Sequence, residues 1–129
     1  MKCNELMVGD WIADKHGFPM QVIAVHRNYL YADCEDNDGD PFMFDDKDFK
    51  PYPILLTDEF FKRNNFNKKI LHWTKGSSIR EKQESGGYVI AIKVFHSSMG
   101  LNATVYCVHE IQQILRLAGY TGLAKIVKL

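Results

Sequence analysis

The chain has 129 residues, 46% of them hydrophobic and 25% charged, which are the proportions of an ordinary globular domain. Its 16 basic residues match its 16 acidic residues, so the zero net charge gives no support to a strongly basic nucleic-acid binder. Three cysteines without a CxxC pair argue against a disulfide framework. No segment approaches the ~20 apolar residues of a membrane span and no signal peptide is expected, so we predict a soluble cytoplasmic protein that makes no membrane contact.

The charges are distributed unevenly along the chain. Residues 33–48 are strongly acidic, whereas residues 62–82 hold seven basic residues and a single acid, Glu81. We therefore expect an acidic face and a basic face on the molecule. The basic segment keeps nucleic-acid binding open as an alternative function.

The first region, residues 1–53, has the pattern of short strands separated by turns. Gly9-Asp10 predicts the first turn, which leads into Trp11-Ile12, and a compact β-branched run occupies residues 20–25. Further strands are expected at residues 29–32 and 42–44, with turns at 15–17 and 28 and a loop at 36–41. This spacing predicts a small antiparallel β-barrel of the SH3-like type.

The second region begins with a short helix. Pro51 and Pro53 favour an extended chain before it. Thr57 is expected to cap a helix over residues 58–64, and Asn64-Asn65 to end that helix in the left-handed conformation.

Two strands follow in the predicted order of elements. A first, weaker strand is expected over residues 69–73, and the polar stretch 74–87 is expected to be a loop. The near-continuous apolar run 88–95 predicts a central strand, and residues 103–107 predict the strand that returns beside it. The run is apolar enough to be covered on both faces, which makes a dimer plausible.

The clearest helical pattern covers residues 108–118 and ends at Gly119. Its apolar residues fall on one face, so the opposite face is expected to present Gln112, Gln113 and Arg116. Residues 123–129 are expected to add a last turn or an edge strand.

Together these elements predict an α+β fold. An SH3-like β-rich module is expected over residues 1–53, and a short helix, a β-hairpin and a C-terminal helix over residues 54–129. The second part is expected to pack on the first, and the alternative is that the whole chain forms one single domain.

Three sequence blocks extend over nearly the whole chain. They are Leu6–Ile12, then Tyr52–Phe61 with Asn65-Phe66, and finally Val108–Leu115 with Leu117-Ala118-Gly119. In their order and spacing these blocks resemble a family of small uncharacterised proteins from gut anaerobic bacteria and their phages or mobile elements. In the last block Gln113 stands where the family usually has Asn. The resemblance implies a phage or mobile-element context, and no catalytic residue transfers from it.

The acidic loop has the composition of a calcium site without its spacing. When Gly39 takes the sixth position of an EF-hand loop, Asp36 and Asp38 fall on ligand positions but Cys34 takes the first one. Strands rather than helices are expected on both sides, so we interpret the loop as a solvated turn. The five histidines are scattered, so no metal site and no cofactor are predicted.

Cys107 and His109 are the closest approach to a catalytic pair in the sequence. A small hydrolase or transferase could use them as thiolate and base. The sequence names no third group to orient them, so we interpret Cys107 as a buried residue and His109 as a capping or packing group. We therefore expect no enzymatic activity and name no catalytic residue.

Two surfaces are candidates for binding. Small barrels can present aromatic rings to peptides or to bases, although such rings also fill cores. The candidate binding residues are the barrel aromatics Trp11, Tyr29 and Tyr31 and the polar helix residues His109, Gln112, Gln113 and Arg116. We predict a non-enzymatic protein–protein interaction or accessory module that binds another protein or a second copy of itself. A nucleic-acid accessory protein is the first alternative, and the Cys–His enzyme is the second.

Overall fold

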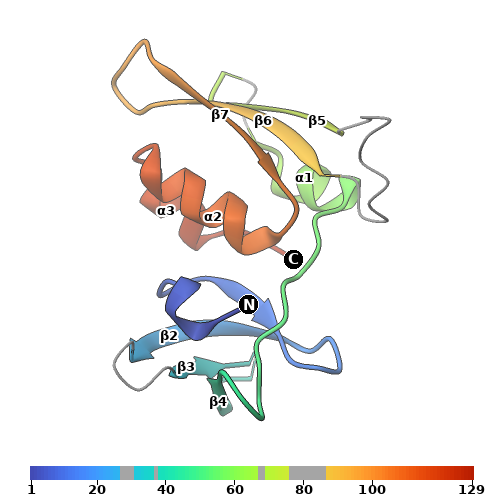
Figure 1. Ribbon diagram of the computed structural model, residues 1–129. Helices are drawn as coiled ribbons and strands as arrows, with labels where there is room; N and C mark the ends of the chain where they lie inside the picture. The colour runs from blue at the N-terminus through green and yellow to red at the C-terminus, as the bar shows by residue number, and fades with distance from the viewer. Residues whose placement is uncertain (27–30, 37, 67–68, 76–86) are drawn as a thin grey trace. The chain divides into compact units, whose positions relative to one another are not determined.

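The computed structural model describes residues 1–26, 31–36, 38–66, 69–75 and 87–129 of the chain (Figure 1). The chain divides into two compact units, Met1–Ile54 and Leu55–Leu129, which we call unit 1 and unit 2. The described residues form two antiparallel sheets and three short α-helices. The predicted α+β class is therefore confirmed.

Unit 1 is a four-stranded antiparallel meander. A 3-10 turn, η1 (Cys3–Glu5), precedes the strands, which are β1 (Trp11–Ala13), β2 (Pro19–His26), β3 (Tyr31–Glu35) and β4 (Pro41–Asp45). Each strand pairs with the next one, in the order β1-β2-β3-β4, and the pairing of β2 with β3 shifts register between Val22 and Ala24. Within the described residues the sheet does not close into a barrel, so the SH3-like barrel is not confirmed.

The core of unit 1 lies on one face of this sheet. Because side chains alternate along a strand, Ala32 and Cys34 point to the same side of β3. Both are fully buried. They belong to a single apolar cluster that also contains Cys3, Leu6, Ile12, Met20, Val22 and Phe44.

Two hairpins of unit 1 close with the same aspartate-based turn. Between β1 and β2, Oδ1 of Asp14 accepts hydrogen bonds from the backbone N–H groups of His16 and Phe18, at 2.8 and 2.9 Å. Between β3 and β4, Oδ1 of Asp36 accepts from the N–H groups of Asp38 and Asp40, both at 2.9 Å. The glycine three positions after each of these aspartates has a positive φ, 85° at Gly17 and 80° at Gly39. Such a φ is easy only for glycine.

Unit 2 contains the second sheet and the α-helices. Its elements are α1 (Asp58–Asn64), β5 (Leu71–Lys75), β6 (Tyr88–Lys93), β7 (Gly100–Val105), α2 (Val108–Leu117) and α3 (Thr121–Lys125). The sheet has the order β5-β6-β7, with both pairs antiparallel. The strand predicted at 69–73 therefore lies two residues later, and a short helix takes the place of the last turn or edge strand.

Strand β6 is central in its sheet but covered on only one face. Tyr88, Ile90 and Ile92 are buried, whereas Val89, Ala91 and Lys93 are exposed. In Figure 1 the helices of unit 2 lie on one side of its sheet. The predicted central position of this strand is confirmed, and its apolar run conceals an alternation between large buried residues and smaller or charged exposed ones.

The helix ends follow the signals in the sequence. Oγ1 of Thr57 accepts a hydrogen bond from the N–H of Phe60, and Asn65 ends α1 in the left-handed conformation with φ 47° and ψ 52°. At the start of α2, Oε1 of Glu110 accepts from the N–H groups of Tyr106 and Cys107, both at 3.0 Å. In the part of the chain that is described, no helix is long and apolar enough to span a bilayer.

Candidate functional site

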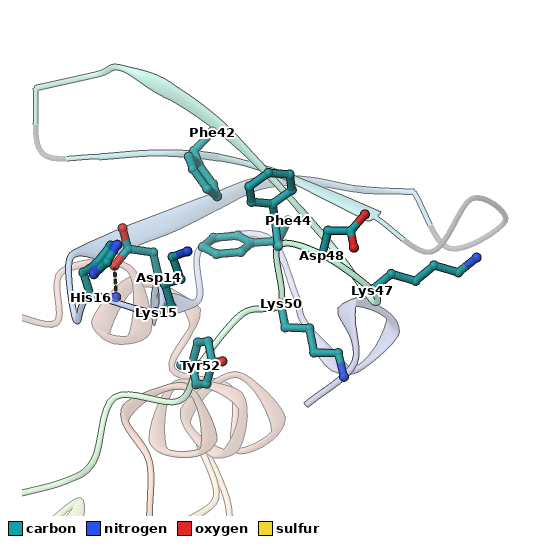
Figure 2. A pocket seen from close by; sticks show the side chains of 10 residues that line it. Asp14, Lys15, His16, Phe42, Phe44, Lys47, Asp48, Lys50 and Tyr52 are labelled. Carbon is teal, nitrogen blue, oxygen red and sulfur yellow. Dashed lines mark hydrogen bonds between the residues drawn. The ribbon is translucent and has the colours of Figure 1, made fainter.

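The most enclosed of the described pockets belongs entirely to unit 1 and has a volume of about 380 Å³. Figure 2 shows that the residues of the β1–β2 turn lie on one side of it and those of the segment after β4 on the other. Its lining comprises Asp14, Lys15, His16, Phe42, Phe44, Lys47, Asp48, Phe49, Lys50 and Tyr52. We call it the β4 pocket. A pocket of this size can enclose one large side chain of a ligand together with parts of its neighbours.

A third aspartate-based turn positions the residues that follow β4. Oδ1 of Asp45 accepts hydrogen bonds from the N–H groups of Lys47, Asp48 and Phe49, at 2.8, 2.8 and 3.0 Å. These backbone hydrogen bonds hold the pKa of the Asp45 carboxyl below its usual value, with the bond from Phe49 contributing most. The carboxylate thus fixes the backbone of the pocket wall and leaves the side chains after it facing outward.

The segment after β4 is attached to β1 at its far end, at Tyr52. Ala13 and Tyr52 exchange two backbone hydrogen bonds, each of 2.9 Å, and so form an isolated antiparallel bridge. The bridge holds the backbone of Tyr52 beside the strand that leads into the Asp14 turn. Because the Tyr52 side chain is 48% exposed, its ring offers surface to a ligand.

Aromatic rings form the floor of the β4 pocket. Phe44 is buried in the core, and its ring lies 4.8 Å from that of Phe42, centroid to centroid. The ring of Phe49 meets Phe42 edge to face at 6.2 Å and is itself 56% exposed. The aromatic surface therefore continues from the core of unit 1 out to solvent.

The charges around the pocket differ from those of the rest of unit 1. Unit 1 contains 11 acidic and 5 basic residues, a formal charge of −6. Three of those five basic residues, Lys15, Lys47 and Lys50, line the β4 pocket, beside only two acids. One of these acids, Asp14, directs Oδ1 to two backbone amides. Basic residues therefore outnumber acidic ones by one in the lining of the pocket, within a unit whose formal charge is −6.

Of the three predicted barrel aromatics, Trp11 has a described side chain, and it is not among the residues that line this pocket. Trp11 opens β1, opposite Gln21 of β2, and is half-buried. Tyr31 opens β3, where its backbone pairs with Asp45, and its side chain lies outside the described part of the structure. Tyr29 also lies outside the described residues.

The predicted polar face of α2 is only partly exposed. Gln112 is fully buried, and its Nε2 donates a hydrogen bond of 3.2 Å to the carbonyl of Ala124 in α3. This corrects the expectation that Gln112 lies on the outer face, because periodicity does not show that α3 covers this part of α2. His109 is also buried, whereas Gln113 and Arg116 are half-buried.

The thiols of the chain lie in environments that suppress their reactivity. All three cysteines are free and buried. Burial, together with the nearby Glu110 carboxylate, raises the pKa of Cys107 to about 12. A thiolate nucleophile requires the opposite shift. Among the described residues, no three His, Cys, Asp or Glu side chains are grouped as metal ligands would be.

Sequence reasoning missed most of the pocket. It predicted a strand at residues 42–44, but it did not connect Phe42 and Phe44 with Phe49, Tyr52 or the lysines. A signal was present, because Asp14 and Asp45 each precede a phenylalanine by four positions. In each turn the backbone N–H of the phenylalanine donates a hydrogen bond to the aspartate, from Phe18 to Asp14 and from Phe49 to Asp45.

Comparisons of the chain with protein-family models, with curated proteins and with solved structures found no match.

Proposed function

We propose that this protein is a non-enzymatic accessory module that binds another protein through the β4 pocket. One observation carries the proposal, namely that half-exposed aromatic rings and three of the five basic residues of unit 1 converge on the same cavity. Aromatic and cationic groups at a concave site are typical of surfaces that recognise peptides.

The state of the cysteines supports a binding role over a catalytic one. The raised pKa of Cys107 leaves a negligible fraction of thiolate at neutral pH, so the pair Cys107 and His109 lacks an activated nucleophile. Three free thiols also suit a reducing compartment, which supports the proposal that the protein acts in the cytoplasm. The phage or mobile-element context is proposed from the resemblance of the three sequence blocks.

A second candidate function rests on unit 2. This unit holds 11 basic and 5 acidic residues, a formal charge of +6. An accessory protein that binds nucleic acid would use such an excess to neutralise phosphates. Titration of labelled single-stranded and duplex oligonucleotides at low salt tests this candidate, and binding must then weaken steeply as salt rises.

Selection from a displayed random-peptide library tests the leading proposal. The purified protein serves as bait, and the double variant Phe49→Ala/Tyr52→Ala serves for comparison. Wild-type protein is expected to enrich peptides that bind saturably, and the double variant to lose about tenfold or more in affinity for them.

Met43→Ala provides the matched control. Met43 is 50% exposed and lies between Phe42 and Phe44, so its side chain points to the other face of β4. The control is expected to bind like wild type. If no peptide is enriched, or if enriched peptides bind the double variant as tightly as wild type, the β4 pocket is not the binding site.

A further inference from the structure

We infer that the β4 pocket is built for an acidic segment of a partner protein, with one large apolar side chain flanked by carboxylates. This inference rests on the proposed function and specifies the chemistry of the partner. The aromatic rings determine where the apolar side chain lies, and the lysines determine the charge of the residues on either side of it.

The positions of the lysines give the reason for the carboxylates. Lys15 comes from the β1–β2 turn, whereas Lys47 and Lys50 come from the segment after β4 and extend away from the aromatic rings, at the rim of the pocket (Figure 2). The cations therefore lie on two sides of the aromatic floor. An extended segment seated on the floor passes between them, so acidic residues both before and after its apolar anchor can reach a lysine.

The aromatic surface gives the reason for the apolar anchor. Phe49 and Tyr52 are both about half-exposed, and Phe42 connects Phe49 to the buried ring of Phe44. A large apolar side chain seated there would be surrounded by rings on several sides and would cover surface that is now exposed to water. The backbone of Phe49 is fixed by the Asp45 turn and that of Tyr52 by the bridge to Ala13, so the pocket needs little ordering when a ligand binds.

The charge of unit 1 favours a short acidic peptide over a nucleic acid. Electrostatic interactions in solution are largely screened beyond about 8 Å at physiological ionic strength. Asp14 and Asp48 also line the pocket, so a few carboxylates of a peptide must be placed beside the three lysines, while acids of unit 1 farther than about 8 Å away are screened. A nucleic acid carries a phosphate at every nucleotide and would extend beyond the lysines, over a unit whose formal charge is −6.

Fluorescence anisotropy with three synthetic peptides tests the inference on the full chain. The first peptide has a central Trp flanked on each side by Asp and Glu, the second has Asn and Gln in their place, and the third has Lys. The acidic peptide is expected to bind about tenfold or more tightly than its neutral counterpart. Its affinity is expected to fall as the salt concentration rises from about 50 to about 300 mM, because salt screens the attraction between carboxylates and lysines. The basic peptide is expected not to bind.

Lysine variants locate the effect. Lys15→Gln and Lys50→Gln are each expected to weaken binding of the acidic peptide about threefold, which is typical of a charge at the rim of an interface. Lys2→Gln is the matched control, because Lys2 is an exposed basic residue of unit 1 that does not line the pocket. It is expected to leave the affinity unchanged.

The outcomes separate this inference from the proposed function. If the neutral peptide binds as tightly as the acidic one, or if the library yields only neutral or basic peptides that depend on Phe49 and Tyr52, the acidic partner is ruled out while the binding module stands. If neither the library nor the acidic peptide gives binding, both proposals fail. If an oligothymidylate displaces the acidic peptide and loses affinity in Lys15→Gln, the occupant is a nucleic acid and the inference is overturned.

Discussion

The phenolic hydroxyl of Tyr88 donates a hydrogen bond of 2.5 Å to Oδ1 of Asp58. The bond connects the first residue of β6 to the first residue of α1, which are 30 positions apart in the sequence. The Tyr88 ring also contacts that of Phe61 at 4.8 Å and that of Trp73 at 5.9 Å. One side chain therefore joins the sheet and the first helix of unit 2 by both polar and apolar contacts.

Removal of this hydroxyl is expected to destabilise the protein. Tyr88→Phe keeps the ring contacts but removes the donor to Asp58, so the free energy of unfolding should fall by about 1 kcal/mol, as for a typical hydrogen bond. Urea denaturation at pH 7 measures the change. Tyr120→Phe is the control, because among the described residues the Tyr120 hydroxyl makes no hydrogen bond. An equal loss in both variants would show that the Tyr88 hydroxyl has no special role.

Alkaline pH is expected to unfold the protein. The pKa of Tyr88 is raised from 10.0 to about 12, mainly by burial, and burial raises those of Cys3, Cys34 and Cys107 from 9.0 to about 12. These four groups are neutral when protonated, and the folded state holds their protons more tightly than the unfolded state does. Their contribution to stability is therefore complete below about pH 9 and is lost as pH rises toward 12.

Urea denaturation at several pH values between 7 and 11 measures this loss. Stability is expected to be level up to about pH 9 and then to fall at each further step, and the fall should be smaller in Cys107→Ala, relative to that variant's own value at pH 7. A stability curve that stays level to pH 11 would contradict the assignment.

The thiols are expected to resist alkylation in the folded protein. A rise in pKa from 9.0 to about 12 lowers the thiolate fraction at pH 8 by about a thousandfold, and burial blocks access as well. Iodoacetamide followed by intact-mass measurement should label no cysteine rapidly in native protein and all three in urea. If Cys107 labels faster than free cysteine at pH 8, the enzymatic alternative regains support.

Alanine at glycines with a positive φ is expected to destabilise the protein. At Gly17 and Gly39 no heavy atom lies within 4 Å of a new Cβ, so alanine at either position should cost about 1 kcal/mol from the positive φ alone. At Gly119 the φ is +97° and a Cβ would lie 2.8 Å from that of Phe95, so Gly119→Ala should cost about 2–3 kcal/mol.

Gly122 supplies the comparison for these variants. It lies in α3 with open space around it and without a positive φ, so Gly122→Ala should stabilise the protein by about 0.5 kcal/mol. Thermal or urea unfolding of the four variants gives the order. If Gly17→Ala and Gly122→Ala shift stability equally, backbone conformation is not the cause.

Helices α1 and α2 could be predicted in detail because their signals are local, whereas α3 was not predicted. Thr57 and Asn65 define α1 through interactions with residues only three or four positions away. The burial of Gln112 could not be predicted, because it depends on α3, which the sequence pattern did not reveal. Its side chain is placed by the carbonyl of Ala124.

The β4 pocket was missed for a related reason. The sequence showed an acidic loop, and composition suggested solvated carboxylates or a cation site. In the structure Asp36 and Asp45 accept backbone N–H groups, and Asp46 accepts a hydrogen bond of 2.8 Å from the N–H of Cys3. Several of the acids therefore organise the chain, and the lysines between and after them provide the local charge.

The shared aspartate turns also have a consequence for the folding kinetics of unit 1. Each strand pairs with the next one along the chain, and the first and third of these hairpins are closed by turns that form within five residues. Because closing short loops costs little entropy and proteins with local contacts fold rapidly, we expect these hairpins to form early. The links from Ala13 to Tyr52 and from Cys3 to Asp46, the latter 43 positions apart, would form last and complete the wall of the pocket.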